Sequence, residues 1–151
     1  MTFGWINVFG AGIVVLMLIP NIIYAVKNKD EKNLCSNKIL NIAEQIGRYG
    51  CMVLMCFPVL VWEFGFKSVL EMLIYTIGNG LLLLAYWVVY FFYFKEKTAN
   101  RAIALAVLPS CIFLLSGITL RHWLLIAFAA VFAVSHILIT KINTTKKSIR
   151  Y

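Results

Sequence analysis

The chain has 151 residues, of which 62% are hydrophobic and 13% are charged, and its formal net charge is +8. A soluble domain of this size is about half apolar and about a quarter charged, so this chain has too little polar surface to cover a water-exposed globule. The mean hydropathy of +0.88 agrees with that conclusion. The composition therefore excludes an ordinary soluble domain and predicts a single integral membrane domain over residues 1–151.

Continuous apolar runs predict an all-α transmembrane bundle of about five helices. A bilayer core needs about 20 apolar residues per helix. The runs cover approximately residues 5–26, 48–62, 69–94, 102–120 and 123–140, and the second reaches full length only if helix continues from Ile39. A membrane β-barrel is disfavoured, because its strands would alternate apolar and polar residues. No basic segment precedes the first run, so we interpret it as a retained helix.

The basic residues gather in alternate loops, and this pattern predicts the orientation. Twelve of the fourteen Lys and Arg residues fall on one side of a five-span chain, and only Lys67 and Arg121 fall on the other. The positive-inside rule then places the N-terminus outside and the C-terminus in the cytoplasm of a multi-pass protein in a cell membrane. Topology and anionic headgroups account for the charge of +8, so no nucleic acid partner is expected.

Four cysteines, Cys35, Cys51, Cys56 and Cys111, are predicted to be free thiols. None forms a CxxC pair, and Cys51 and Cys56 point about 140° apart on a helix. We therefore expect neither a disulfide nor a structural zinc site. The chain has no HExxH motif or cluster of carboxylates and histidines, so the sequence predicts no metal site and no cofactor.

The clearest polar pattern lies in the third apolar run. Tyr75, Asn79, Tyr86, Tyr90 and Tyr93 fall within about 60° of one another on a helix. One interpretation is a cavity lined by tyrosine hydroxyls and rings, which can hold organic cations or flat apolar ligands. The alternative is that the tyrosines anchor the helix at the interfaces while Asn79 bonds a neighbouring helix. We expect Asn79 and Tyr86 to point into the bundle and to border a cavity.

Three further positions, Glu44, Arg48 and His136, are weaker candidates for the same cavity. Glu44 and Arg48 stand four residues apart and can pair along a helix, either as an anion site at the cytoplasmic mouth or as a solvated pair on a surface helix. His136 lies deep in the last run and is a candidate ligand-binding residue, although a bond to another helix is the commoner role. His122 lies in the preceding turn and has a side chain that titrates near neutral pH.

Three function classes stay open on the sequence alone. The tyrosine–asparagine face favours a small-solute transporter, a channel or a ligand-binding membrane protein. Small size and the absence of a motif favour a structural or accessory subunit, either as a homo-oligomer or with a partner membrane subunit. A membrane-embedded enzyme is least supported, because no convergent set of acid, base and nucleophile is present. The expected partners are the lipid bilayer and a small-molecule ligand.

Cysteines introduced at Thr2 and Ser148 of an otherwise cysteine-free chain test the topology. We expect a membrane-impermeant thiol reagent added to intact cells to label the first position only, because an odd number of spans separates the termini. Labelling of Ser148→Cys should require permeabilised cells. Labelling of both positions from the same side would show that the number of spans is even.

Overall fold

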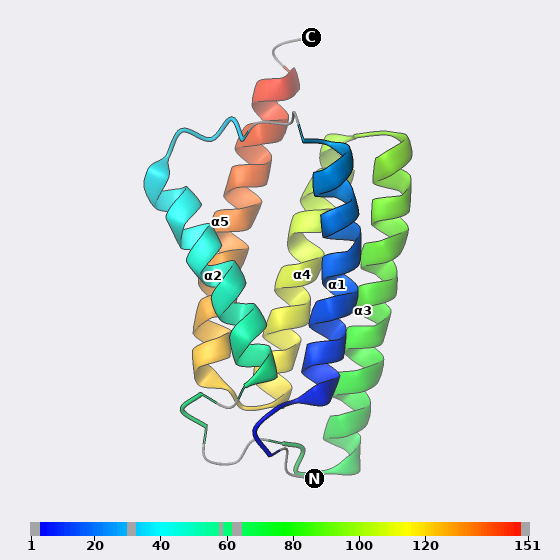
Figure 1. Ribbon diagram of the computed structural model, residues 1–151, viewed down its shortest axis with the longest axis vertical. Coiled ribbons are helices and arrows are strands. Elements are labelled where there is room, and N and C mark those ends of the chain that lie inside the picture. Colours follow the sequence, from blue (N-terminus) through cyan, green and yellow to red (C-terminus); the bar gives the residue numbers. More distant parts are fainter. Residues whose placement is uncertain (1–3, 30–32, 58, 62–64, 149–151) are drawn as a thin grey trace.

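The computed structural model describes residues 4–29, 33–57, 59–61 and 65–148, and within this part of the chain all regular structure is helical. The helices are α1 (Val8–Lys27), α2 (Lys38–Cys56), α3 (Val69–Lys95), α4 (Ala99–Thr119) and α5 (Trp123–Ser148), shown in Figure 1. The prediction of an all-α bundle of about five helices is confirmed.

Four of these helices, α1, α3, α4 and α5, are long and apolar enough to cross a membrane. They fit an integral, multi-pass membrane protein, and α5 continues eight residues beyond its predicted end at Thr140. The helix of the predicted second span, 48–62, does continue back to Ile39, because α2 begins at Lys38. Its predicted end is wrong, because α2 ends at Cys56. Asn37 caps α2, where its side chain accepts hydrogen bonds from the Ile39 and Leu40 amides, and the chain turns extended at Phe57. Pro58 and Trp62 fall within the predicted range 48–62, but they lie outside the described residues.

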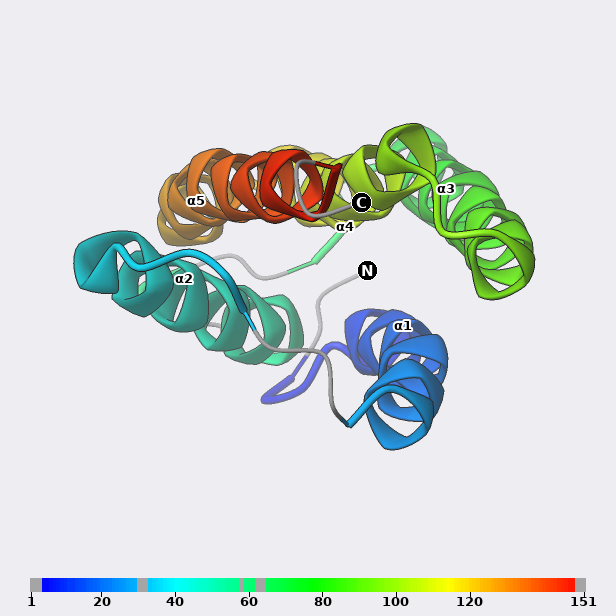
Figure 2. The same ribbon diagram turned by 90° about the horizontal axis from the view of Figure 1, so that it is seen from above.

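The helices form two layers. In Figure 2, α5, α4 and α3 stand in a row, while α2 lies over α5 and α1 lies over α3. Two hydrogen bonds fasten α1 to α3: Trp87 Nε1 donates to the Leu16 carbonyl at 3.1 Å, and the Tyr90 hydroxyl donates to Asn21 Oδ1 at 2.7 Å. The central helix α4 therefore faces the space between α1 and α2.

Successive helices run in opposite directions, so alternate connections meet at the same end of the bundle (Figure 1). The α1–α2 and α3–α4 connections lie at the end where α5 finishes, which we call the basic end. Lys67 and Arg121 lie at the opposite end, near the start of α1. The fold thus has the charge asymmetry that the predicted orientation requires, and the orientation itself stays a prediction.

Helix α2 buries one carboxylate and exposes a row of apolar side chains. Its buried residues are Glu44, Gly47, Cys51, Leu54 and Met55, whereas its exposed apolar residues include Ile39, Ile42, Ile46 and Val53. This exposed apolar face is the opposite of what an amphipathic helix on a water-soluble protein shows. It suits a helix whose outer face contacts lipid and whose polar groups must find partners within the protein.

Glycine lets α2 approach α5 at backbone distance. A Cβ atom on Gly47 would lie 2.9 Å from the Cα of Phe132, and one on Gly50 would lie 2.1 Å from the Phe128 ring. Small residues at such crossings permit the dense packing that drives helix association in lipid.

The two helices of the second layer meet only near the end where α1 starts. The Asn7 amide donates to the Cys56 carbonyl at 2.8 Å, and Asn7 Nδ2 donates to the Met55 carbonyl at 3.2 Å. A Cβ on Gly10 would lie 2.3 Å from that Met55 oxygen. The described parts of α1 and α2 therefore meet at this end of the bundle, which we call the closed end, and they diverge from it towards the basic end (Figure 1).

All four cysteines are free, as predicted. Cys35 and Cys51 are buried, while Cys56 and Cys111 are partly exposed. A cysteine-free background for labelling must therefore replace two buried side chains, and alanine is the substitution that introduces no polar group there.

Substitution of Gly47 tests the α2–α5 contact. We expect Gly47→Ala to lower the free energy of unfolding by about 1–3 kcal/mol, because the atoms that oppose its Cβ are helix backbone and cannot swing aside. Gly12→Ala is the matched control, since a Cβ there meets nothing within 4 Å. That variant should be neutral or stabilised by up to about 1 kcal/mol. Equal stability of the two variants in mixed-micelle unfolding would contradict the packing.

Candidate ligand-binding cavity

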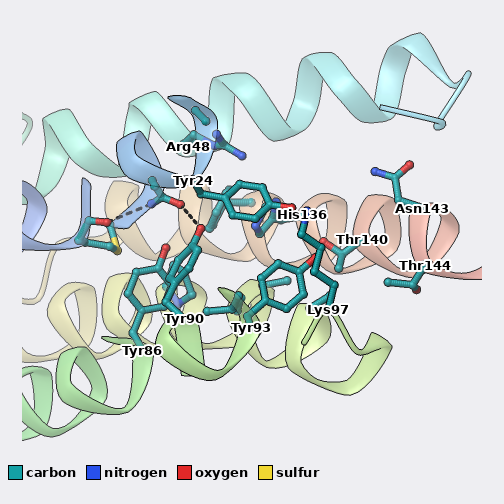
Figure 3. Close-up of a pocket in the computed structure, with 18 of the residues that line it drawn as sticks. Tyr24, Arg48, Tyr86, Tyr90, Tyr93, Lys97, His136, Thr140, Asn143 and Thr144 are labelled. Carbon is teal, nitrogen blue, oxygen red and sulfur yellow. Dashed lines mark hydrogen bonds between the residues drawn. The ribbon is translucent and has the colours of Figure 1, made fainter. Parts of the chain in front are cut away.

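A cavity of about 1480 Å³ lies between the five helices in the half of the bundle nearest the basic end. It sits in front of α4, where α1 and α2 have diverged. The polar and aromatic side chains that line it include Asn21, Tyr24, Arg48, Tyr86, Tyr90, Tyr93, His136, Thr140, Asn143 and Thr144 (Figure 3). Smaller residues of α4, such as Ala102 and Ala106, form its back wall.

The polar stripe of α3 faces the bundle. Of the 27 residues in this helix, the buried ones are Tyr75, Asn79, Tyr86 and Tyr90. The side chains on the opposite face are mainly exposed leucine, valine and phenylalanine, which suit lipid. Burial thus agrees with the expectation that Asn79 and Tyr86 point inward.

Only one half of this stripe borders the cavity. Tyr86 and Tyr90 line it together with Tyr93. The rings of Tyr86 and Tyr90 pack edge to face with centroids 5.0 Å apart, and Tyr24 of α1 lies 6.1 Å from Tyr90 and 5.7 Å from Tyr93. Residues from two helices thereby form a continuous aromatic wall, visible in Figure 3.

The other half of the stripe is packed away from the cavity, so the expectation that Asn79 borders it is wrong. The Ser116 hydroxyl donates to Asn79 Oδ1 at 3.4 Å, and Asn7 Nδ2 donates to the Tyr75 hydroxyl at 3.3 Å. Neither Asn79 nor Tyr75 has exposed surface. Residues of α1 and α4 close around this part of α3, so Asn79 takes the role that the alternative interpretation gave it, a bond to a neighbouring helix.

A charged cluster joins α2 to α5 beside the cavity. Arg48 Nη2 bonds Oε1 of Glu44, and Nδ1 of His136 lies 3.2 Å from the same oxygen. The Glu44 side chain is only 6% exposed, so this carboxylate is not solvated as the alternative interpretation expected. The His136 ring stacks on Phe132 with centroids 4.8 Å apart. Arg48 and His136 both line the cavity, and Glu44 lies behind them.

The polar groups at the opposite end are engaged with one another. Arg121 Nη1 lies 2.6 Å from Glu71 Oε1, and the Lys67 amide donates to Glu71 Oε2 at 2.7 Å.

His122 is fully buried, and burial lowers the pKa of its imidazole below the usual value. Burial therefore favours the neutral form of this imidazole.

Sequence reasoning missed the contribution of α5 beyond residue 140. Thr140, Asn143, Thr144 and Lys147 all line the cavity, and they recur at the three- and four-residue spacing of one helix face. That spacing was the available signal, but it begins where the apolar run ends. Tyr24 was missed because it stands alone in its run.

Comparison of the chain with protein-family models, with curated proteins and with solved structures finds no match. Among the described residues, no group of three His, Cys, Asp or Glu side chains is placed to hold a metal ion. The chemistry of the cavity must therefore be argued from its own side chains.

Proposed function

We propose that this membrane protein binds a small-molecule ligand in the cavity between its five helices, as a transporter or receptor for that molecule. The observation that carries the proposal is the cavity itself, with a volume of about 1480 Å³. Small-molecule sites are typically concave pockets of about 300–1,000 Å³, largely apolar with a few convergent polar groups. The tyrosine wall and the Arg48–His136 pair supply that combination here.

The closed end of the bundle favours a transporter or receptor over an open channel. Asn7 and Gly10 of α1 abut Met55 of α2 there, and Tyr75 fills the space behind them without exposed surface. The cavity lies beyond this plug, towards the basic end. Under the predicted orientation, a solute would reach it from the cytoplasmic side, while a channel would need a continuous path.

The cluster of Glu44, Arg48 and His136 supports a function at this place. Charged side chains within membrane helices are costly, and they commonly mark ligand or ion pathways. Glu44, Arg48 and His136 meet at the side of the cavity, on two helices that are distant in sequence.

Paired cysteine variants test whether the cavity is open to water and ligand. Ala102 lines the cavity, whereas Ala104 is two residues further along α4 and is not part of the lining. In a cysteine-free chain reconstituted in liposomes, Ala102→Cys should react with a charged thiol reagent about tenfold faster or more. The reason is that thiolate attack requires water, and Ala104→Cys faces the other side of the helix.

A ligand screen then uses the same variant. A compound that occupies the cavity should slow the labelling of Ala102→Cys and raise the thermal midpoint of the unmodified protein. At a concentration of a hundred times its dissociation constant, the compound should raise the free energy of unfolding by about 2.7 kcal/mol. Equal labelling of the two variants would refute an open cavity. Rapid labelling of Ala102→Cys, with no protecting compound in a broad screen, would favour the accessory-subunit class instead.

A further inference from the structure

We propose that the ligand is an anionic amphiphile, with an acidic headgroup bound beside Arg48 and a hydrocarbon chain that leaves the cavity between α1 and α2. This inference rests on the proposed function, because it names the class of molecule that the cavity holds. Three features carry it: the sign of the charges that line the cavity, the occupancy of its aromatic faces, and the apolar opening on its side.

The charged side chains that line the cavity are all basic. They are Arg48, Lys97 and Lys147, and no Asp or Glu of the described chain is among the lining residues. Glu44 lies behind Arg48 and engages only its Nη2 nitrogen. A guanidinium group carries five N–H donors in a planar fork that matches a carboxylate or a phosphate. Because the Arg48 side chain is 36% exposed, Nε and Nη1 can serve a second anion from the cavity.

One ring of the aromatic wall, Tyr24, already faces a cation of the chain itself, which makes a cationic ligand less favourable there. Lys97 Nζ already lies 5.3 Å from the centre of the Tyr24 ring and takes up a cation–π position. The same ammonium group donates to Asn28 Oδ1 at 2.5 Å, which holds it at the mouth of the cavity. A second cation would meet like charges from Lys97 and Arg48. An anion would be attracted by both.

The side of the cavity between α1 and α2 is apolar and reaches the outer surface. Leu18 and Met17 line it from α1, while Met52 and Tyr49 line it from α2. Tyr49 is 62% exposed, so the lining continues onto the face of the bundle that lipid contacts. Figure 1 shows the two helices diverging here after their contact at the closed end. A hydrocarbon chain can lie in this opening with its far end in the bilayer.

The axial route into the cavity is narrowed by the segment before α2. Leu34 lines the cavity, its amide donates to Asn143 Oδ1 at 2.9 Å, and Lys146 Nζ donates to its carbonyl at 2.9 Å. These bonds hold the segment against α5 at the basic end. A water-soluble solute would have to pass this segment, whereas an amphiphile can enter from the side.

A panel of oleoyl compounds tests the inference by native mass spectrometry and thermal shift in neutral detergent. It contains oleate, dioleoyl phosphatidylglycerol, dioleoyl phosphatidylcholine and a dioleoyl trimethylammonium lipid, together with acetate and inorganic phosphate as headgroups without a chain. We expect the anionic amphiphiles to bind at least about tenfold more tightly than the zwitterionic or cationic ones, since a charge-assisted hydrogen bond contributes about that factor. Preference for oleate identifies a free carboxylate, and preference for phosphatidylglycerol identifies a lipid phosphate.

Two variants localise the binding. Arg48→Gln should weaken binding of the preferred anionic amphiphile about tenfold or more. Because this change also removes a partner of Glu44, Leu18→Trp provides a second test that leaves the charged cluster intact and fills the side opening. Ile19→Trp is its matched control: Ile19 is 39% exposed and is not among the residues that line the cavity. Of these two tryptophan variants, only Leu18→Trp should reduce binding of the preferred anionic amphiphile.

Several results would overturn the inference. They are equal or tighter binding of the cationic or zwitterionic lipid, equally tight binding of acetate or phosphate alone, and wild-type affinity in both Arg48→Gln and Leu18→Trp. If a water-soluble compound protects Ala102→Cys while no anionic amphiphile binds, the inference fails and the proposed function stands. If Ala102→Cys is also unreactive, both fail.

Discussion

The structure depends on a single carboxylate that lipid cannot solvate. Glu44 lies in a helix whose outer face is isoleucine and valine, so its charge can be compensated only from within the protein. Arg48 meets it from the same helix and His136 from α5, both at one oxygen. A buried charge that loses its partners is strongly destabilising, so this contact fixes the rotation of α2 about its own axis.

Once that rotation is fixed, the other contacts of α2 follow. Gly47 lies between Glu44 and Arg48, and Gly50 follows Arg48 by two residues. These two glycines leave room for the backbone of Phe132 and the ring of Phe128. Helix α2 therefore packs against α5, while hydrogen bonds from Trp87 and Tyr90 attach α1 to α3. Helices α2 and α1 thus pack on opposite ends of the layer formed by α5, α4 and α3. Among the described residues, they are joined where Asn7 contacts Met55. The cavity is the space that this arrangement leaves in front of α4.

Much of this arrangement could be predicted from the sequence, because lipid imposes simple rules. Hydropathy identified four spans, and the spacing of Tyr75, Asn79, Tyr86 and Tyr90 identified the buried face of α3. Hydropathy misplaced α2, because a helix that carries charges inward and apolar residues outward resembles a surface helix in its average composition. The spacing alone also predicts that the polar stripe of α3 forms a single site. Its division into a packed half and a cavity half depends on Ser116 and Asn7, whose proximity only the folded chain creates. For the same reason, the sequence alone does not predict the contact between His136 and Glu44, which makes His136 part of the site.

A double-mutant cycle on Glu44 and His136 measures the central contact directly. Glu44→Gln, His136→Gln and the double variant are each unfolded in mixed micelles, and the free energies of unfolding are compared with that of the parent chain. If the two side chains bond across the α2–α5 interface, the double variant should lose less stability than the sum of the single losses, by about 0.5–3 kcal/mol. Losses that add to within about 0.3 kcal/mol would show that the two groups do not interact, and would contradict the account of how α2 is held.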